Sequence, residues 1–296
     1  MDKTKKAIIS ALIAQIIFGF SFMATKIALG IASPLTVIAN RYMVATIALT
    51  LVMLTGKFGI SLKGKKISRV LVMSLFQPVL YFIFESYGID MTTSAFSSVM
   101  IALIPVASIF CGMIMLSEKV SLLQGLFTVL SVLGVTVVAL QGKAEGTITF
   151  LGVLLLFGAV ISSTLYNTMS RKISGEFTVF ERTYIQTIVG LISFLILALI
   201  ENKDAPIKVV NSFMNAEYVL AILYLGVVSS VVAFLLLNFA NTYLPVAKTT
   251  AFSNLTTVVS VLAGAIFLNE KLGIISALGI VMIITGVWGA QKGKKK

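Results

Sequence analysis

Six charged side chains lie inside long apolar stretches of this 296-residue sequence, where a charge is costly and is a functional hypothesis by default. They are Lys26, Arg41, Glu85, Glu181, Arg182 and Lys248. A carboxylate in such a place can pair with a cation to close a gate, bind a cationic group or carry a proton. The alternative is that long side chains near helix ends extend to lipid headgroups and have no specific role.

Polar side chains also recur at helical spacing. Gln77, Tyr81 and Glu85 fall at i, i+4 and i+8, which places them on one helix face. The corresponding stripe near the N-terminus is Gln15, Gly19, Phe22 and Lys26. A polar face on a membrane helix must look into protein or water, so we expect a substrate cavity. Its expected lining is Gln15, Phe22, Asn40, Gln77, Tyr81, Tyr166, Asn167, Gln186, Asn238 and Asn254. Hydrogen bonding between helices is the alternative use of these groups.

Other site chemistries lack the residues that they need. The sequence has no histidine, and its one cysteine, Cys111, has apolar neighbours, so we expect no metal and no cofactor. A glycine-lysine motif for phosphate is absent, so active transport would have to use an ion or substrate gradient. A membrane enzyme would need catalytic groups clustered at one depth, and the sequence has no adjacent carboxylate pair. We therefore expect no enzymatic activity.

Apolar runs of about twenty residues occur along nearly the whole chain, each long enough to cross a hydrocarbon core of roughly 30 Å. Hydrophobic residues make up 58% of the sequence and charged residues 11%, whereas soluble domains carry about 25% charge. We predict an all-α integral membrane protein with ten transmembrane helices. Their ranges are 7–30, 34–55, 69–88, 92–116, 121–140, 148–170, 178–200, 218–240, 245–268 and 272–290.

Lysine and arginine are distributed unevenly between the predicted loops. One side collects Lys3, Lys5, Lys6, Lys57, Lys63, Lys65, Lys66, Arg69, Lys119, Arg171, Lys172, Lys292, Lys294, Lys295 and Lys296. The other side collects only Lys143, Lys203, Lys208 and Lys271. Because basic loops stay in the cytoplasm, we place both termini there, in a multi-pass protein of the plasma membrane. The net charge of +12 is then a topology signal and a contact with anionic lipid, and we expect no nucleic acid as a partner.

The second half of the sequence repeats the first. A shift of 152 residues aligns Leu116, Glu118, Lys119 and Gly134 with Leu268, Glu270, Lys271 and Gly286. We divide the chain into two repeats, residues 1–145 and 146–296, with five predicted spans each. Because five is odd, the repeats are expected to lie in opposite orientations in the bilayer, as is typical of secondary transporters.

Small and acidic residues within the repeat have expected structural roles. Four glycines are predicted to let helices approach closely: Gly112, Gly134, Gly264 and Gly286. We expect Glu118 and Glu270 to cap short turns and not to bind substrate.

Several motifs recur in the order seen in one known family. They are Phe18-Gly19 with Lys26, Pro34, Arg41, Ile104-Pro105-Val106, Leu116-Ser117-Glu118-Lys119, Gly134, Leu268-Asn269-Glu270-Lys271 and Gly286. In this pattern the chain resembles the EamA-type members of the drug/metabolite transporter superfamily over essentially its whole length. The resemblance implies ten helices in two inverted five-helix repeats, cytoplasmic termini, export of a metabolite, and a dimer-forming or scaffold region in the fourth and fifth spans. The chain departs from the pattern at Phe18, where the family often has tryptophan, and at Thr257, where a proline would match Pro105.

The repeat relates the buried charges to one another. Arg41 corresponds to Arg182 in the second span of the other half, so the two are expected near opposite membrane faces. We hypothesise that Glu85 pairs with Arg41 or Lys26 to close an outer gate. The inner gate would contain Glu181, Arg182 and Lys248. Proton coupling needs a titrating group at depth, for which Glu85 is the first candidate and Glu181 the second; exchange and facilitated diffusion stay open.

Together these features predict a secondary transporter that moves a small metabolite, an amino acid or related compound, outward by alternating access. The alternative is efflux of cationic drugs, which in small multidrug relatives depends on an acidic residue in the first span. Here that span holds Gln15 and Lys26 and no carboxylate, which disfavours a cation. A membrane scaffold or receptor is the alternative outside transport.

Overall fold

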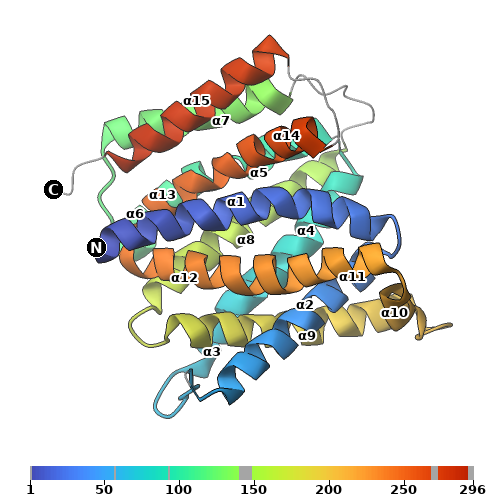
Figure 1. Cartoon of the computed structure of the whole chain (residues 1–296). Helices are drawn as coiled ribbons and strands as arrows, with labels where there is room; N and C mark the ends of the chain where they lie inside the picture. The colour runs from blue at the N-terminus through green and yellow to red at the C-terminus, as the bar shows by residue number, and fades with distance from the viewer. Residues whose placement is uncertain (1, 57, 93, 140–148, 268–272, 293–296) are drawn as a thin grey trace.

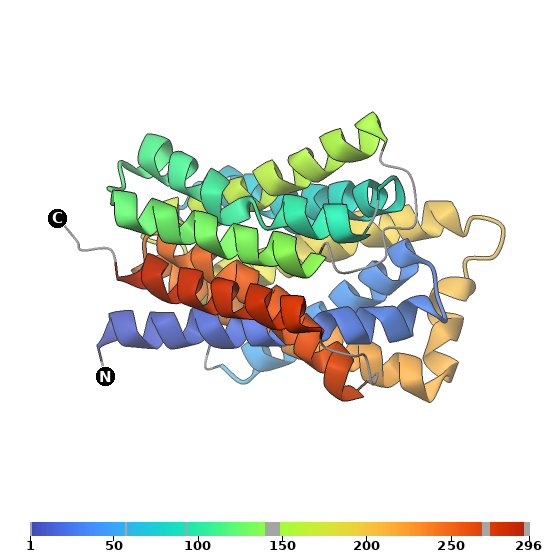
Figure 2. The same ribbon diagram turned by 90° about the horizontal axis from the view of Figure 1, so that it is seen from above.

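The computed structural model describes residues 2–56, 58–92, 94–139, 149–267 and 273–292. Within those ranges every regular element is helical, and the helices pack side by side in one bundle (Figures 1 and 2). Nine of the described helices are long and apolar enough to cross a membrane. They match nine of the ten predicted spans, so the prediction of an all-helical membrane protein is confirmed.

The first part of the chain forms five consecutive spans. Their elements are α1 (Lys3–Leu29), α2 (Pro34–Leu54), α3 (Ile67–Ser74), η1 (Leu75–Leu80), α4 (Tyr81–Asp90), α5 (Ser94–Ile101), α6 (Ile104–Leu116) and α7 (Leu122–Ala139). The start of α2 is fixed locally, because the Ser33 side chain accepts the backbone N–H of Thr36 and Pro34 occupies the first turn.

The second part begins at α8 and repeats this order. Its elements are α8 (Phe150–Lys172), α9 (Val179–Glu201), α10 (Lys208–Asn211), η2 (Ser212–Met214), α11 (Ala216–Leu223), η3 (Tyr224–Ala233), α12 (Phe234–Tyr243), α13 (Val246–Ala251), η4 (Phe252–Asn254), α14 (Leu255–Phe267) and α15 (Ile274–Gln291). A capping box starts α9, in which Thr178 and Glu181 satisfy each other's backbone N–H groups.

Equivalent spans of the two parts are interrupted at equivalent places. The third span changes to a π-helix at η1, and the eighth span does so at η3. Pro78 lies in η1, and Gln77 before it has a non-helical backbone (φ −146°, ψ 119°), so the span kinks at this proline. The fourth span breaks between α5 and α6, and the ninth breaks at η4. This last break is why the predicted span 245–268 is not one of the nine long helices, although α13, η4 and α14 follow one another without a gap.

Helix packing pairs equivalent elements of the two predicted repeats. The helices α7 and α15 lie together, as do α2 and α9, and α8 packs on α4 and α6 as α1 packs on α12 and α14. The start of α1 and the end of α15 lie at one end of the bundle (Figures 1 and 2), which we call the basic end. The loop that joins α2 to α3 and the end of α8 also lie there, so most of the lysines and arginines that the structure describes gather at this end.

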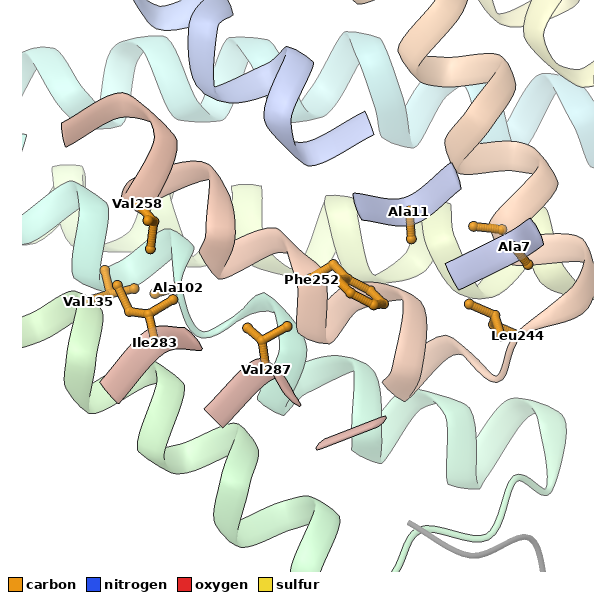
Figure 3. Packing of buried hydrophobic residues seen from close by; sticks show 10 residues of the cluster. Ala7, Ala11, Ala102, Val135, Leu244, Phe252, Val258, Ile283 and Val287 are labelled. Carbon is orange, nitrogen blue, oxygen red and sulfur yellow. The ribbon is translucent and has the colours of Figure 1, made fainter. Parts of the chain in front are cut away.

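Small residues bring α7 and α15 into direct backbone contact. A Cβ atom added to Gly134 would lie 2.7 Å from the carbonyl oxygen of Gly279, and one added to Gly286 would lie 2.6 Å from the backbone nitrogen of Ser131. Both glycines therefore allow close helix approach, as predicted. Beside this pair, Ala102, Val135, Phe252, Val258, Ile283 and Val287 form an apolar cluster that extends to Ala7, Ala11 and Leu244 (Figure 3).

Replacing Gly134 with alanine is expected to lower the thermal unfolding midpoint in detergent. The added Cβ overlaps the backbone of α15, and overpacking of this kind costs about 1–3 kcal/mol. Gly125→Ala is the matched control on the same helix, because no atom lies within 4 Å of its added Cβ. Alanine at position 125 should leave the midpoint unchanged or raise it slightly. Equal midpoints for the two variants would contradict the close packing.

Gly112 makes room for a side chain and not for a neighbouring helix. A Cβ atom added there would lie 3.0 Å from Oε2 of Glu118, and that oxygen accepts the backbone N–H of Val246 at 2.9 Å. Glu118 thus caps the start of α13, as predicted, and Arg171 approaches it at 3.7 Å. Partial burial raises the pKa of the Glu118 carboxyl above its usual value, against the opposing effects of these two partners. The predicted cap at Glu270 and the predicted packing at Gly264 lie outside what the structure describes.

Candidate functional site

A buried arginine near the middle of the bundle joins three helices. Arg41 of α2 donates from Nε to Oγ of Ser230 at 2.6 Å and from Nη2 to Oγ of Ser229 at 2.9 Å. The hydroxyl of Ser21 on α1 donates to Ser229 at 2.9 Å. Since Arg41 is only 7% exposed and its partners are neutral, the cluster carries a positive charge.

The helix α4 brings a carboxylate and aromatic rings to the same region. Tyr81 donates its hydroxyl to Oε1 of Glu85 at 2.7 Å, so this part of the predicted polar stripe is formed. The Arg41 guanidinium lies 5.3 Å from the ring centre of Phe82, a cation–π contact. Gln77 departs from the stripe, because its extended backbone in η1 breaks the helical spacing.

Arg41 and Glu85 interact electrostatically but do not form an ion pair among the described residues. The hydrogen bonds of Arg41 with described residues use Nε and Nη2, and that of Glu85 uses Oε1. The expected pairing of Glu85 with Arg41 is therefore not formed in this conformation, and Lys26 is exposed near the end of α1. One guanidinium nitrogen and one carboxylate oxygen remain without a protein partner in the part of the chain that the structure describes.

Aromatic side chains close the bundle on the basic side of this cluster. Phe18 lies one helical turn before Ser21, and Phe234 lies one turn after Ser230. The two rings meet edge to face at 5.3 Å, and the ring of Tyr166 meets Phe234 at 6.2 Å. A layer of rings from α1, α8 and α12 thus separates the Arg41 cluster from the basic end.

Beyond these rings, a second buried arginine holds α8, α9 and α12 together. Arg182 donates from Nη1 to the carbonyl oxygen and the hydroxyl of Ser170, at 2.6 and 2.7 Å. Its Nη2 donates to the carbonyl oxygen of Asn238 at 3.0 Å and to the hydroxyl of Thr242 at 2.5 Å. Arg182 is 0% exposed, so this network closes the basic half of the bundle tightly.

Four further predicted residues belong to this closed network. The Tyr166 hydroxyl contacts Oε1 of Gln186 at 3.1 Å and Oδ1 of Asn238 at 3.2 Å. The amide of Asn241 donates to Oδ1 of Asn167 at 3.0 Å. All of these groups are buried, so in this conformation they hold helices together and none faces an open cavity.

Glu181 fastens the loop between α2 and α3 to the start of α9. Its two carboxylate oxygens accept from Nζ of Lys65 at 2.7 and 2.6 Å, and Oε1 also accepts the backbone N–H of Ser61 at 2.9 Å. Oε2 accepts the backbone N–H of Thr178 at 2.8 Å. The carboxylate is thus placed at the basic end, as the inner-gate hypothesis expects, and its partner is Lys65 and not Arg182.

Replacing Glu181 with glutamine is expected to loosen that loop. A hydrogen bond to a charged group contributes about 1.5–3 kcal/mol, so amide hydrogen exchange at Ser61 should become roughly 10- to 100-fold faster. Glu176→Gln is the matched control, since Glu176 pairs with Arg69 at an exposed site of the same end. An unchanged exchange rate in the Glu181 variant would show that the loop is held by other contacts.

Several predicted cavity residues instead join helices elsewhere in the bundle. Gln15 accepts a hydrogen bond from Thr256 on α14 at 2.9 Å, and Gly19 on the same face packs against Val259. The Asn254 amide donates to Ser131 of α7. The Asn40 amide donates to Tyr218 and to the carbonyl oxygen of Val209. Both amides therefore point away from the Arg41 cluster.

Lys248 donates to the carbonyl oxygen of Gln291 on α15 at 2.7 Å and so lies apart from Arg182. The side chain of Phe22 is outside the described residues. The interhelical alternative holds for Gln15, Asn40 and Asn254, because their polar faces look toward neighbouring helices.

Comparison with known proteins identifies the family. A model described as the EamA-like transporter family matches residues 5–140 and, separately, residues 150–290. The chain belongs to this family. It is 33% identical to the uncharacterized transporter YcxC of Bacillus subtilis, over 96% of this chain and 92% of that protein. It is 22% identical to an uncharacterized transporter of Archaeoglobus fulgidus, over 96% of this chain and 98% of that protein.

A protein of known crystal structure has the same fold as this EamA-like transporter. The two superpose with a TM-score of 0.80 over 97% of this chain and 98% of the other, at 15% sequence identity. At that identity the likeness concerns the fold alone. Fold, family and long apolar helices together make the chain a multi-pass membrane transporter.

In this EamA-like transporter, two residues of the Arg41 cluster were missing from the predicted polar faces: Ser21 and Ser229. Serine is common as an interhelical contact in membranes, so type alone gives no signal. The available signal was depth, because Ser229 and Ser230 form a polar pair in the middle of the eighth span.

The two arginines occupy different positions in their helices when residues are counted from the helix caps. Arg41 is eight residues after its N-cap Ser33, whereas Arg182 is four residues after its N-cap Thr178. Counted from the caps, the equivalent of Arg41 is Gln186. The two arginines therefore lie at different depths in their own helices.

Proposed function

We propose that this protein is a secondary transporter that binds a small zwitterionic metabolite, an amino acid or related compound, at the Arg41 cluster. It exports that compound across the plasma membrane by alternating access. The two five-helix repeats, residues 1–145 and 146–296, move against each other around the cluster, to which α1, α2 and α4 contribute from the first repeat and η3 from the second.

One observation carries the choice of substrate class. A guanidinium and a carboxylate come from two helices to one region, and each keeps an atom without a protein partner among the described residues. A carboxylate of the substrate matches the forked donors of Arg41, with the hydroxyls of Ser229 and Ser230 beside it. An ammonium group of the substrate matches Glu85 and the Tyr81 hydroxyl. A zwitterion satisfies both charges, whereas a simple cation or anion satisfies one.

The closed layers support access from the side opposite the basic end in this conformation. The positive-inside rule assigns the basic end to the cytoplasm, with both termini there. The aromatic layer and the Arg182 network lie between that end and the cluster, so the substrate would enter from the cytoplasm only after both layers open. Arg182 and Glu181 are then parts of the inner gate. Glu85, half-buried beside the substrate, is the candidate for proton coupling.

Efflux of cationic compounds is the second candidate, and a specific observation favours it. The carboxylate of Glu85, the Tyr81 hydroxyl and the ring of Phe82 form an acidic aromatic group of the kind that recognises quaternary ammonium. Arg41 beside this group opposes it by like-charge repulsion. A homodimer through the fourth and fifth spans of each repeat stays the assembly that the family resemblance predicts.

The test is a substrate panel measured with the purified protein in liposomes. Each amino acid is compared with its amide, which lacks the carboxylate, with its N-acetyl derivative, which lacks the ammonium group, and with a quaternary ammonium compound. We expect transport of the free amino acid. The half-saturating concentration of either derivative should be roughly 10- to 100-fold higher, since each loses a charged hydrogen bond. Preference for the quaternary ammonium compound would favour cation efflux instead.

A further inference from the structure

A groove of about 510 Å³ opens beside the basic end, within the range of roughly 300–1,000 Å³ that is usual for ligand sites. The first turns of α1 form one wall, with Lys6 and Ile9, and α12 forms the floor, with Leu235 and Phe239. The opposite wall comes from α2, α9 and the loop between α2 and α3. In Figure 1, α12 lies between α1 and the pair formed by α2 and α9. Among its described lining residues, only Lys6 and Ser10 have polar side chains.

The position of the groove in the fold makes it accessible to lipid. Ile9, which lines it, is 44% exposed, and the helices that form it are candidate membrane spans. Lys6 is exposed one turn before Ile9, nearer the start of α1, at the depth of the headgroups. An apolar groove that ends at a lysine therefore matches an amphiphile with a chain inside and an anionic head at its mouth.

Basic side chains gather at the mouth of the groove. Lys3, Lys5 and Lys6 lie together at the start of α1, and Asp2 is the single acidic residue before Glu85 in the sequence. Neither Lys5 nor Lys6 forms an ion pair within the described part of the chain. Basic pockets between transmembrane helices at the cytoplasmic side are suited to anionic lipid headgroups.

We propose that this groove binds one acyl chain of an anionic phospholipid, with the phosphate of the headgroup held by Lys6. The bound chain packs against Phe58 and Phe180, whose rings stack at 5.3 Å with 17° between their planes. Phe58 lies in the same loop that Lys65 and Ser61 fasten to Glu181. Lipid in the groove therefore supports the conformation in which the basic end is closed.

The experiment measures thermal unfolding of the purified full-length protein in detergent, without substrate, during titration with phosphatidylglycerol. We expect a saturable rise in the unfolding midpoint that phosphatidylcholine and soluble glycerol phosphate do not produce. Lys6→Gln should weaken the apparent affinity about fivefold, the effect of one lysine near an anionic surface, and added salt should reduce that difference. Ile9→Trp, which fills the groove from an exposed position, should remove the shift while the lipid-free midpoint stays unchanged.

Lys172→Gln is the matched control, because Lys172 is an exposed lysine of the same end and is not part of the groove. It should titrate as the unmodified protein does. The proposal is overturned if phosphatidylcholine gives an equal shift, if glycerol phosphate alone reproduces it, or if Lys6→Gln and Ile9→Trp both titrate as the unmodified protein. Because no substrate is present, these outcomes are independent of whether the protein transports amino acids.

Discussion

Replacing Arg41 with glutamine is expected to raise the half-saturating amino-acid concentration by roughly 10- to 100-fold, or to abolish transport. The variant loses the forked cationic donor that matches a substrate carboxylate, a charged hydrogen bond of about 1.5–3 kcal/mol. Uptake of labelled amino acid into liposomes measures the change. Arg41→Lys keeps the charge but not the fork, so it should restore only part of the affinity.

The control for Arg41 removes another guanidinium from the same protein. Arg69 pairs with Glu176 at an exposed site of the basic end, and Arg69→Gln should leave the transport kinetics unchanged. The panel adds a second check, because Arg41→Gln should equalise the affinities of an amino acid and its amide. If the variant still prefers the free amino acid, Arg41 does not recognise the carboxylate.

Replacing Arg182 with glutamine is expected to lower the thermal unfolding midpoint by roughly 5–10 °C and to impair transport. The carbonyl oxygen of Ser170 loses its charged donor in a site from which water is excluded, whereas that of Asn238 keeps the hydroxyl of Thr242 as a donor. Each unsatisfied buried group costs about 1–3 kcal/mol, and each kcal/mol shifts the midpoint by about 2–4 °C. Thermal unfolding in detergent is the measurement.

Arg171→Gln is the graded comparison for this effect. Arg171 also donates to the carbonyl oxygen of Thr242, but it is partly exposed and its ion pair with Glu118 is long, at 3.7 Å. Water can replace many of the hydrogen bonds that this arginine forms. The unfolding midpoint of Arg171→Gln should therefore fall by less than half as much as that of Arg182→Gln. Equal decreases in the midpoint of the two variants would mean that the burial of Arg182 does not increase its contribution to stability.

The spans could be predicted from sequence because lipid imposes one simple requirement on every helix. The expected ranges 34–55 and 178–200 differ by at most one residue at each end from the observed Pro34–Leu54 and Val179–Glu201. The interruption at η4 was not predicted, since no proline marks it. Hydropathy measures only whether a segment suits the bilayer, so it gives no signal for a local change of helix type.

The site was harder to predict for a physical reason. A polar stripe shows that a face avoids lipid, but not which neighbour it meets. Tyr81 and Glu85 meet the Arg41 region, whereas Gln15 and Asn254 meet α14 and α7. Buried charge is the stronger signal because it needs either a partner or a function. It located Arg41, Arg182 and Glu181, although the partners of all three come from other parts of the chain than the gate hypothesis assumed.

Solute counterflow tests the central claim most directly, namely that a zwitterion bound at the Arg41 cluster is carried across the membrane. Liposomes that contain the purified protein are loaded with unlabelled amino acid and diluted into a trace of the same compound in labelled form. We expect transient accumulation of label above the external concentration, strong with the unmodified protein and lost in Arg41→Gln. Absence of accumulation beyond that of protein-free vesicles, for every amino acid of the panel, would contradict it.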